Sequence, residues 1–464
     1  MIEPRESHSF VNHISMRNAL RFIPVAAIAF SLFSPAPAQS QGLRGKISDL
    51  FIFGEGQDPL FLAGSGDPNN PANLRAHGDH FVPSSAAENF TVISFITDAI
   101  GRNVANMPIG STSGSETFRF VGGVPVRTST SAGPIFAERP QTLGRGRVLA
   151  GVNRSGFRFA TIRGVDMRDI DLTFTHENVD FPGCSETFGG DCAKYGIPVF
   201  ENEVMEFNLD IDLDVRVTSV FLTYGLSDKV DVGLVMPIVQ AKFAGQSRAQ
   251  ITPFGGTAAP HYFSGTSQNP VLVAERQTHG SAFGLGDVAL RLKSNFRSTP
   301  NASVGFLLDA RLPTGSEDDL LGAGSFAGRA LAIVATKYGD FSPHLNFGYL
   351  YRGGKSQNDA VLGTAGFDHR LGAGVTLAAD VVSEMQVGDS HLELPETVFY
   401  ESPFRRSLVP TEIPAVRDDV INGSFGLKIS ATKGMTMVLN TLFPLNRGGL
   451  RADLIYTAGL EYSF

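Results

Sequence analysis

One stretch of the sequence alternates without interruption between apolar and polar side chains: Met205-Glu-Phe-Asn-Leu-Asp-Ile-Asp-Leu-Asp-Val-Arg-Val217. Successive side chains of a β-strand point to opposite faces, so a period of two predicts a strand with one apolar and one charged face. The same alternation recurs at 302–312, 343–352 and 453–464. The chain is therefore predicted to be all-β after its N-terminal region.

Composition supports this reading and excludes several classes of protein. Of the 464 residues, 42% are hydrophobic and 18% are charged, and there are 51 glycines. Each glycine in a helix costs about 1 kcal/mol relative to alanine, which disfavours a mainly helical chain. The net charge of −8 gives no basic surface for a phosphate backbone, so nucleic acid is not an expected partner.

Such strands build either a soluble sandwich, which buries the apolar face, or a membrane barrel, which turns it towards lipid. Short turns alternate with long polar loops along the chain, as in outer-membrane barrels. The long loops are expected near 179–202, 244–282, 313–326, 353–360, 387–419 and 445–451. The last strand ends on Tyr462 and Phe464, which we interpret as the signal for the outer-membrane assembly machinery. These features favour an antiparallel up-and-down transmembrane barrel.

About 12 strands are expected, or 14 if 117–128 also pairs. Their predicted ranges are 146–163, 204–224, 229–243, 285–296, 302–312, 327–338, 343–352, 361–369, 374–385, 420–430, 435–444 and 453–464. A tilted strand crosses a membrane in about 9–11 residues. Strand 204–224 is about twice that length, and 169–175 alternates as well and could pair with it. We therefore expect the first hairpin to protrude outward.

The N-terminus has the pattern of an export signal. Arg17 and Arg21 precede an apolar run at 22–33, and Ala36-Pro-Ala38 follows it. A basic region, a short apolar region and an A-x-A site predict a signal peptide at 1–38, in which 1–15 is read as a misassigned start. The expected location is thus the outer membrane of a Gram-negative bacterium.

Residues 39–145 precede the barrel, which is assigned to 146–464. Ser85 and Glu88 form a capping box before a helical apolar pattern, so a helix is predicted at 86–100. Two readings remain open for this region: a plug inside the barrel, or a periplasmic extension. Arg145 and Arg147 are expected either to pair with luminal acids or to line the periplasmic rim.

The two cysteines, Cys184 and Cys192, lie in a Gly-rich stretch of the protruding hairpin. In an oxidising compartment two close cysteines predict one structural disulfide. C-x-x-C redox spacing is absent.

Three segments, 133–147, 222–237 and 284–290, resemble the outer-membrane transporter family that is grouped with the MetA-type proteins of phenol degradation. The resemblance spans roughly 130–464. It implies a barrel that works on the same principle as hydrophobic-compound channels of the long-chain fatty acid transporter kind.

No catalytic motif is present, and no enzymatic activity is expected. His261-Tyr-Phe-Ser264 offers the residue types of a hydrolase but lies in an expected loop. The most conspicuous polar feature is a row of acidic side chains on one face of the predicted strand 204–224, which we call the acidic ladder. Three interpretations of it remain open: a solvated outer face, a vestibule that attracts cations, and a Ca²⁺ site. The vestibule would comprise Glu206, Asp210, Asp212 and Asp214, and the Ca²⁺ ligands would be Asp210, Asp212, Asp169 and Asp171. No other cofactor is expected.

A second set of charges is predicted to face the lumen, where it either sets selectivity or forms mutually neutralising pairs. It comprises Asp309, Arg311, Arg291, Lys293, Asp380 and Glu384. The function predicted from these features is passive uptake of small hydrophobic or aromatic compounds. The alternative is a non-transporting barrel whose acidic hairpin binds a surface partner. Membrane lipid and lipopolysaccharide are expected partners of either.

Overall fold

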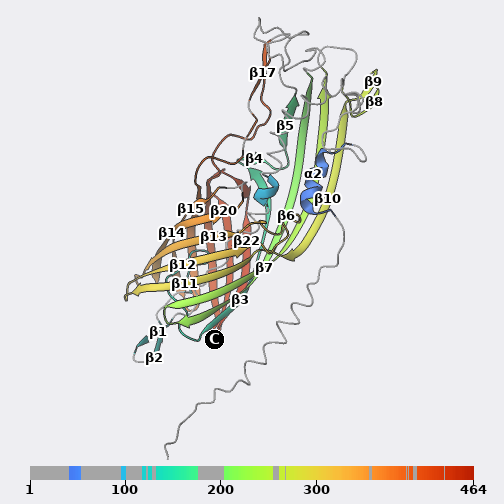
Figure 1. The fold of residues 1–464 in the computed structure, drawn as a ribbon. Coiled ribbons are helices and arrows are strands. Elements are labelled where there is room, and N and C mark those ends of the chain that lie inside the picture. The colour runs from blue at the N-terminus through green and yellow to red at the C-terminus, as the bar shows by residue number, and fades with distance from the viewer. Residues whose placement is uncertain are drawn as a thin grey trace, which may run out of the picture. The chain divides into compact units, whose positions relative to one another are not determined.

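The computed structural model describes residues 41–53, 96–100, 118–121, 124–127, 132–175, 203–253, 261–266, 268–354, 358–392, 394–395, 397–400, 405–432 and 434–464. Residues 41–464 form one compact unit built around an antiparallel β-barrel (Figure 1). The predicted signal peptide, Cys184 and Cys192 lie outside the described residues.

Twelve strands close the barrel, as predicted. Each pairs with its neighbours in the order β7-β11-β12-β13-β14-β15-β16-β19-β20-β22-β3-β6, and β6 pairs with β7 to complete the ring. Their bounds are β3 (Val148–Ile162), β6 (Val204–Ser227), β7 (Val230–Thr252), β11 (Val288–Ser298), β12 (Ala302–Leu312), β13 (Ala327–Thr336), β14 (Phe341–Arg352), β15 (Ala360–Gly372), β16 (Val375–Gln386), β19 (Val420–Thr432), β20 (Met435–Pro444) and β22 (Ile455–Ser463).

The two ends of the barrel differ in their connections. Short turns join β6 to β7, β11 to β12, β13 to β14, β15 to β16 and β19 to β20. Val148 and Phe464 meet at this same end, where each backbone N–H donates to the carbonyl of the other at 2.9 Å. We call this the short-turn end, and the opposite one the long-loop end.

The long strands extend beyond the rest of the barrel at its long-loop end, and this protruding part contains more strand than expected. β6 has 24 residues and β7 has 23, and their upper parts pair with β5 (Ile170–Thr175) and β10 (Val273–Leu285). The expectation of a loop over 244–282 is wrong, because 244–252 continue β7 and 273–285 form β10. The inward positions there include Gly245, Ser247 and Ala249, which are too small to produce a clear hydrophobic period.

The remaining strands are short and do not enlarge the ring. β1 (Phe118–Val121) pairs only with β2 (Val124–Arg127), so the fourteen-strand alternative is wrong. The other short strands are β4 (Val165–Asp166), β8 (Ser264–Thr266), β9 (Asn269–Val271), β17 (Val398–Tyr400), β18 (Arg406–Leu408) and β21 (Leu450–Ala452).

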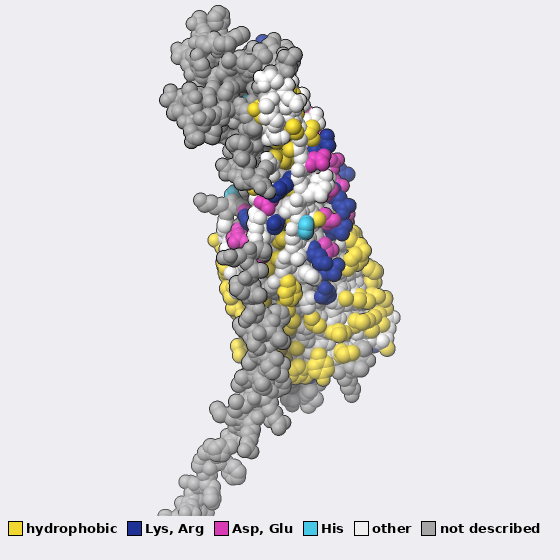
Figure 2. Space-filling model, turned by 90° about the vertical axis from the view of Figure 1, so that its right-hand side faces the viewer, with side chains coloured by type: hydrophobic (Ala, Val, Ile, Leu, Met, Phe, Trp, Pro, Cys, Tyr) yellow, Lys and Arg dark blue, Asp and Glu magenta, His cyan; other side chains and the backbone are white. Residues whose placement is uncertain are grey.

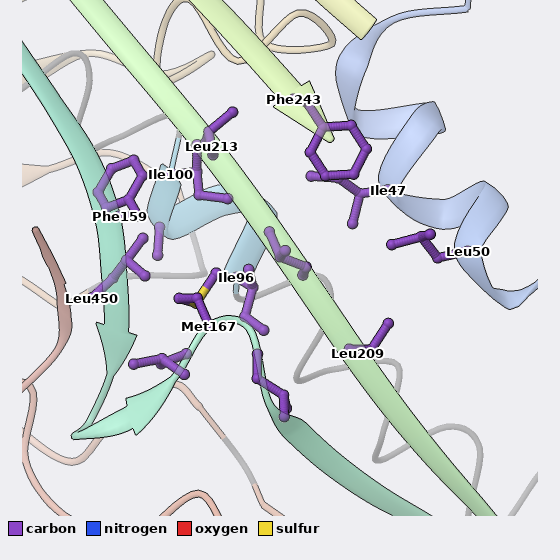
Figure 3. Close-up of a cluster of buried hydrophobic side chains, with 14 of the residues drawn as sticks. Ile47, Leu50, Ile96, Ile100, Phe159, Met167, Leu209, Leu213, Phe243 and Leu450 are labelled. Carbon is purple, nitrogen blue, oxygen red and sulfur yellow. The ribbon is translucent and has the colours of Figure 1, made fainter. Parts of the chain in front are cut away.

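A separate hydrophobic core fills the protruding part. Helix α2 (Leu43–Ser48), the 3-10 turn η2 (Asp49–Phe51) and a helical segment at 96–100 pack against the apolar face of β6 (Figure 3). Arg44 links α2 to the segment 96–100 and to the connection between β12 and β13, since its guanidinium lies 2.5 Å from Asp98 and 3.0 Å from Glu317. Residues 96–100 are the end of the predicted helix 86–100, whose earlier part lies outside the described residues.

The outward-facing side chains of the long strands β6 and β7 change from apolar to polar at one height along the barrel. On β6 the outward positions from Val220 onward are apolar, whereas Arg216 and the outward positions before it are mostly polar or charged. β7 changes at the matching level, because Ile238 pairs with Thr218 and Gln240 pairs with Arg216. Figure 2 shows the apolar side chains gathered below a band of charged ones. This change marks the edge of the hydrocarbon layer.

Within the protruding part the apolar face of the strands therefore points inward, whereas in the membrane-spanning part the apolar face points outward. The apolar positions of 205–217 point inward and are buried, while the charged ones point outward. Outside this part of the barrel is water rather than lipid, so burial is favourable only on the inner side. No helix in the described part of the chain is long and apolar enough to cross a membrane.

Candidate functional site

Residues 132–147, which we call the luminal strap, cross the interior of the barrel near its short-turn end. At one end the backbone N–H of Ala132 donates to Thr376 Oγ1 at 2.9 Å, on β16. Further along, Gln141 Nε2 donates to Ser303 Oγ on β12, also at 2.9 Å. The strap therefore reaches across the lumen from one wall of the barrel to another.

Apolar contacts hold the first half of the strap. Ile135 is buried and packs with Ala378 and Val438. Pro140 lies so close to Gly305 that a Cβ built there would approach the proline Cβ to 2.9 Å. Glycine at 305 therefore lets the strap lie directly against the wall.

The strap ends at the barrel entry, against the β6–β7 turn. The backbone N–H of Leu143 lies 3.1 and 3.0 Å from the two carboxylate oxygens of Asp231. The N–H of Gly146 donates to the carbonyl of Gly225 at 2.8 Å. Arg145 is exposed and only its backbone N–H contacts an acid, Asp228, so its side chain belongs to the rim rather than to a luminal pair.

The centre of the strap is charged and buried. Glu138 lies 3.7 Å from Arg291 and 3.9 Å from Lys293. Asn346 accepts from the N–H of Glu138 at 2.7 Å and donates to its carbonyl at 3.0 Å. One amide side chain thus satisfies both backbone groups of a residue that makes no ladder bonds of its own, as buried backbone requires.

Arg139 begins a chain of polar contacts along the wall. Its guanidinium binds Asp368, with Nε 3.1 Å from Oδ1, and both side chains are almost fully buried. His344 lies 3.7 Å from Asp368 through Nδ1 and 2.6 Å from Asp380 through Nε2. The two carboxylates are thus joined through one guanidinium and one imidazole, all of them buried away from water.

Asp309 is the hub of a second group. Its carboxylate lies 2.8 Å from Arg329, 3.0 Å from Arg291 and 3.7 Å from Arg311. Because Arg291 also contacts Glu138, the strap and the wall belong to one network. Arg352 binds Glu384 nearer the long-loop end.

The structure places all six predicted luminal charges on the inner face of the barrel. It pairs them with residues that were not singled out from the sequence. These partners are Glu138, Asp231, Arg329, His344 and Arg352. Two further buried pairs lie elsewhere in the lumen, Arg139 with Asp368 and Lys428 with Glu461. The partners on the barrel wall can be found from the alternation of inward and outward positions along a strand, since His344, Asn346 and Ser342 share one face of β14. The strap residues have no such periodic signal.

A cavity of about 110 Å³ remains on the long-loop side of the strap. Its apolar lining includes Phe136 of the strap and Leu331, Leu350 and Leu362 of the wall. Its polar lining includes Arg311, Arg329, Asn346 and Glu384. The lining is thus apolar on part of its surface and polar or charged on the rest, a combination that can hold and orient a small molecule.

The acidic ladder lies on the outer face of β6, above the hydrocarbon layer, rather than around the lumen. Asp212 contacts Arg158 at 3.0 Å and Arg168 at 3.1 Å. Asn208 donates to both Asp169 and Asp171. Burial is the largest influence on Asp210 and raises the pKa of its carboxyl. Among the described residues no group of three or more acidic, histidine or cysteine side chains is arranged to hold a metal ion.

The residues that could suggest hydrolysis do not face one another in a catalytic arrangement. His261 is buried against Glu203, whereas Ser264 is exposed at the start of β8. Tyr462 and Phe464, the predicted assembly signal, are exposed on the outer face, with ring centroids 5.6 Å apart.

Fold and lumen together define a transmembrane β-barrel of the outer-membrane type with an internal strap. Residues 202–438, just over half of the chain, match the family described as "Putative MetA-pathway of phenol degradation". The chain belongs to this family.

Several solved barrels are similar to this chain at low identity. An outer membrane channel from Pseudomonas putida F1 is 13% identical over 70% of this chain and 98% of its own, with a TM-score of 0.39. A Pseudomonas aeruginosa FadL homologue is 10% identical over 68% and 90%, with a TM-score of 0.32. A deltaS2 mutant of the TodX monoaromatic hydrocarbon channel is 11% identical over 79% and 99%, with a TM-score of 0.33. No curated protein sequence matches. The fold rests on the strand pairing described above rather than on these likenesses.

Proposed function

We propose that this protein is an outer-membrane channel for the passive uptake of small hydrophobic or aromatic compounds. The observation that carries the proposal is the partly apolar cavity beside a strap that crosses the lumen from wall to wall. An enzyme would need a reacting constellation, and a general porin would need a wide aqueous lumen. A small enclosed space suits compounds that bind one at a time.

The orientation follows from export. Both ends of the barrel sequence lie at the short-turn end, and outer-membrane barrels keep short turns in the periplasm. The protruding part and the long loops then face outward, so a permeant would enter from the long-loop end and reach the cavity first. The signal peptide at 1–38, the Cys184–Cys192 disulfide and recognition of Tyr462 and Phe464 by the assembly machinery belong to the same proposal.

Size limits the permeant. An apolar cavity of ~150 Å³ accommodates benzene, and the cavity here is about 110 Å³. A single ring therefore needs a modest displacement of the lining. Further passage requires the strap to leave its place, because it contacts the wall on both sides. No energy source is needed, since the compound moves down its gradient.

The cavity can be tested by filling it. Leu350 is buried on the inner face of β14, whereas Leu345 on the same strand faces lipid and is 53% exposed. We expect Leu350→Trp to reduce uptake of a monoaromatic compound into proteoliposomes at least fivefold, and Leu345→Trp to leave it unchanged. Heat-modifiable migration in electrophoresis verifies that both variants are folded. Equal uptake by folded Leu350→Trp and wild type would refute the assignment of the cavity, and a wild type that transports nothing would refute the channel.

A further inference from the structure

A second hollow lies on the outside of the barrel. This groove has a volume of about 580 Å³ and crosses β19, β20, β22 and β3 to reach β6. Its outward-facing apolar side chains include Phe425, Leu439, Tyr456 and Ala458. Phe425 is 51% exposed and Tyr456 is 62% exposed, so the groove opens towards lipid and not towards the lumen.

Two arginines form one end of the groove. Arg154 is opposite Thr218 on β6 and Ala458 on β22, and Arg216 is opposite Gly156 on β3. This is the level at which the outward face changes from apolar to charged. The apolar floor therefore lies in the hydrocarbon layer, while the guanidinium groups lie at its outer edge.

Both guanidinium groups keep donors available for a ligand. Arg216 Nε contacts Asp214 at 3.2 Å, and its side chain remains 47% exposed. Arg154 donates to the Thr218 hydroxyl at 3.3 Å and has no ion pair among the described residues. Between them, Gly156 leaves open space, because a Cβ built there would meet nothing within 4 Å.

We propose that this groove binds a phosphorylated glycolipid of the outer leaflet. One acyl chain would lie along the apolar floor, and a phosphate would sit between Arg154 and Arg216. Guanidinium groups bind phosphate oxygens through paired, charge-assisted hydrogen bonds. The arginines lie at the edge of the layer nearer the protruding part, so the lipid comes from the leaflet on that side. This site is independent of uptake through the lumen.

The test measures lipid binding to the full-length purified protein by native mass spectrometry in detergent. Bisphosphorylated lipid A is the probe, and dephosphorylated lipid A and phosphatidylglycerol are the comparisons. We expect one bound lipid A. We also expect Arg154→Gln/Arg216→Gln to raise its dissociation constant at least about tenfold, which corresponds to about 1.4 kcal/mol. Ala458→Phe, which fills the groove, should weaken binding similarly.

Matched controls separate the groove from the general surface. Arg248→Gln removes an exposed arginine from β7, and Val334→Phe enlarges a lipid-facing side chain on β13. Neither lines the groove, and both should bind lipid A like the wild type. The proposal is overturned if the folded double variant keeps wild-type affinity. It is also overturned if dephosphorylated lipid A or phosphatidylglycerol binds equally well, or if Arg248→Gln weakens binding as much.

Discussion

Removing the charge of Arg139 should release the luminal strap. Arg139→Gln leaves Asp368 without the guanidinium that it binds, and the Asp368 side chain is fully buried. Breaking one partner of a buried ion pair costs about 3–5 kcal/mol. The polar His344 Nδ1 still lies 3.7 Å from Asp368 in the variant, so we use the lower value.

About 3 kcal/mol corresponds to roughly a hundredfold change in the ratio of docked to undocked strap. Single-channel recording in planar bilayers measures this ratio as the fraction of time spent open. We expect Arg139→Gln to raise that fraction about a hundredfold over the wild type. Arg145→Gln is the matched control, because Arg145 belongs to the same strap but its side chain is exposed. Arg139→Gln/Asp368→Asn, which leaves no buried charge at this pair, should restore part of the closure. A folded Arg139→Gln protein with the open fraction of the wild type would refute the reasoning.

Three further outcomes are expected. Gly305→Ala should destabilise strap docking by about 1–3 kcal/mol through overpacking, because the added Cβ would lie 2.7 Å from the Ser294 carbonyl of β11 and 2.9 Å from Pro140 Cβ of the strap. Gly156→Ala, which points into open space, should leave docking unchanged, and the protease susceptibility of the strap measures both variants. Calcium should leave the melting temperature of the protein unchanged, because arginines already pair with Asp212. A calcium-dependent rise in melting temperature that Asp210→Asn/Asp212→Asn abolishes would instead show that a Ca²⁺ site exists. Cys184→Ser/Cys192→Ser should lower the stability of the hairpin tip by about 2–3 kcal/mol, and labelling of thiols in the unfolded, unreduced wild type should find none free.

The barrel could be predicted from sequence because its geometry imposes a period of two on every crossing. Residues 302–312 and 435–444 show this plainly, since one face meets lipid and the other meets the lumen. The same rule was insufficient for β10 and the upper half of β7. There Gly245 packs against Leu50 of η2, and a larger side chain would collide with it. Close packing of a helical segment thus removed the signal that identifies a strand.

The luminal charges show both what sequence reasoning can find and where it stops. The alternation of their strands predicts that Asp309 and Arg291 face the lumen. The partner of Arg291 on the strap, Glu138, cannot be predicted in this way, because a segment bonded to the wall through side chains has no regular period. The acidic ladder was harder to place, since the alternation in 205–217 does not say which face is inside. Only the length of β6 beyond the membrane reveals that its charged face meets water.

The central claim is that permeants cross the lumen past a strap that must move. Ile135→Cys/Ala378→Cys, made in a Cys184→Ser/Cys192→Ser background, would tie the strap to β16 through a disulfide between two side chains that pack together. The direct measurement is uptake of a monoaromatic compound into proteoliposomes before and after reduction of this cross-link. The account predicts that the oxidised protein transports at least tenfold more slowly and that reductant restores the rate. Uptake that proceeds at the wild-type rate with the strap cross-linked would contradict it.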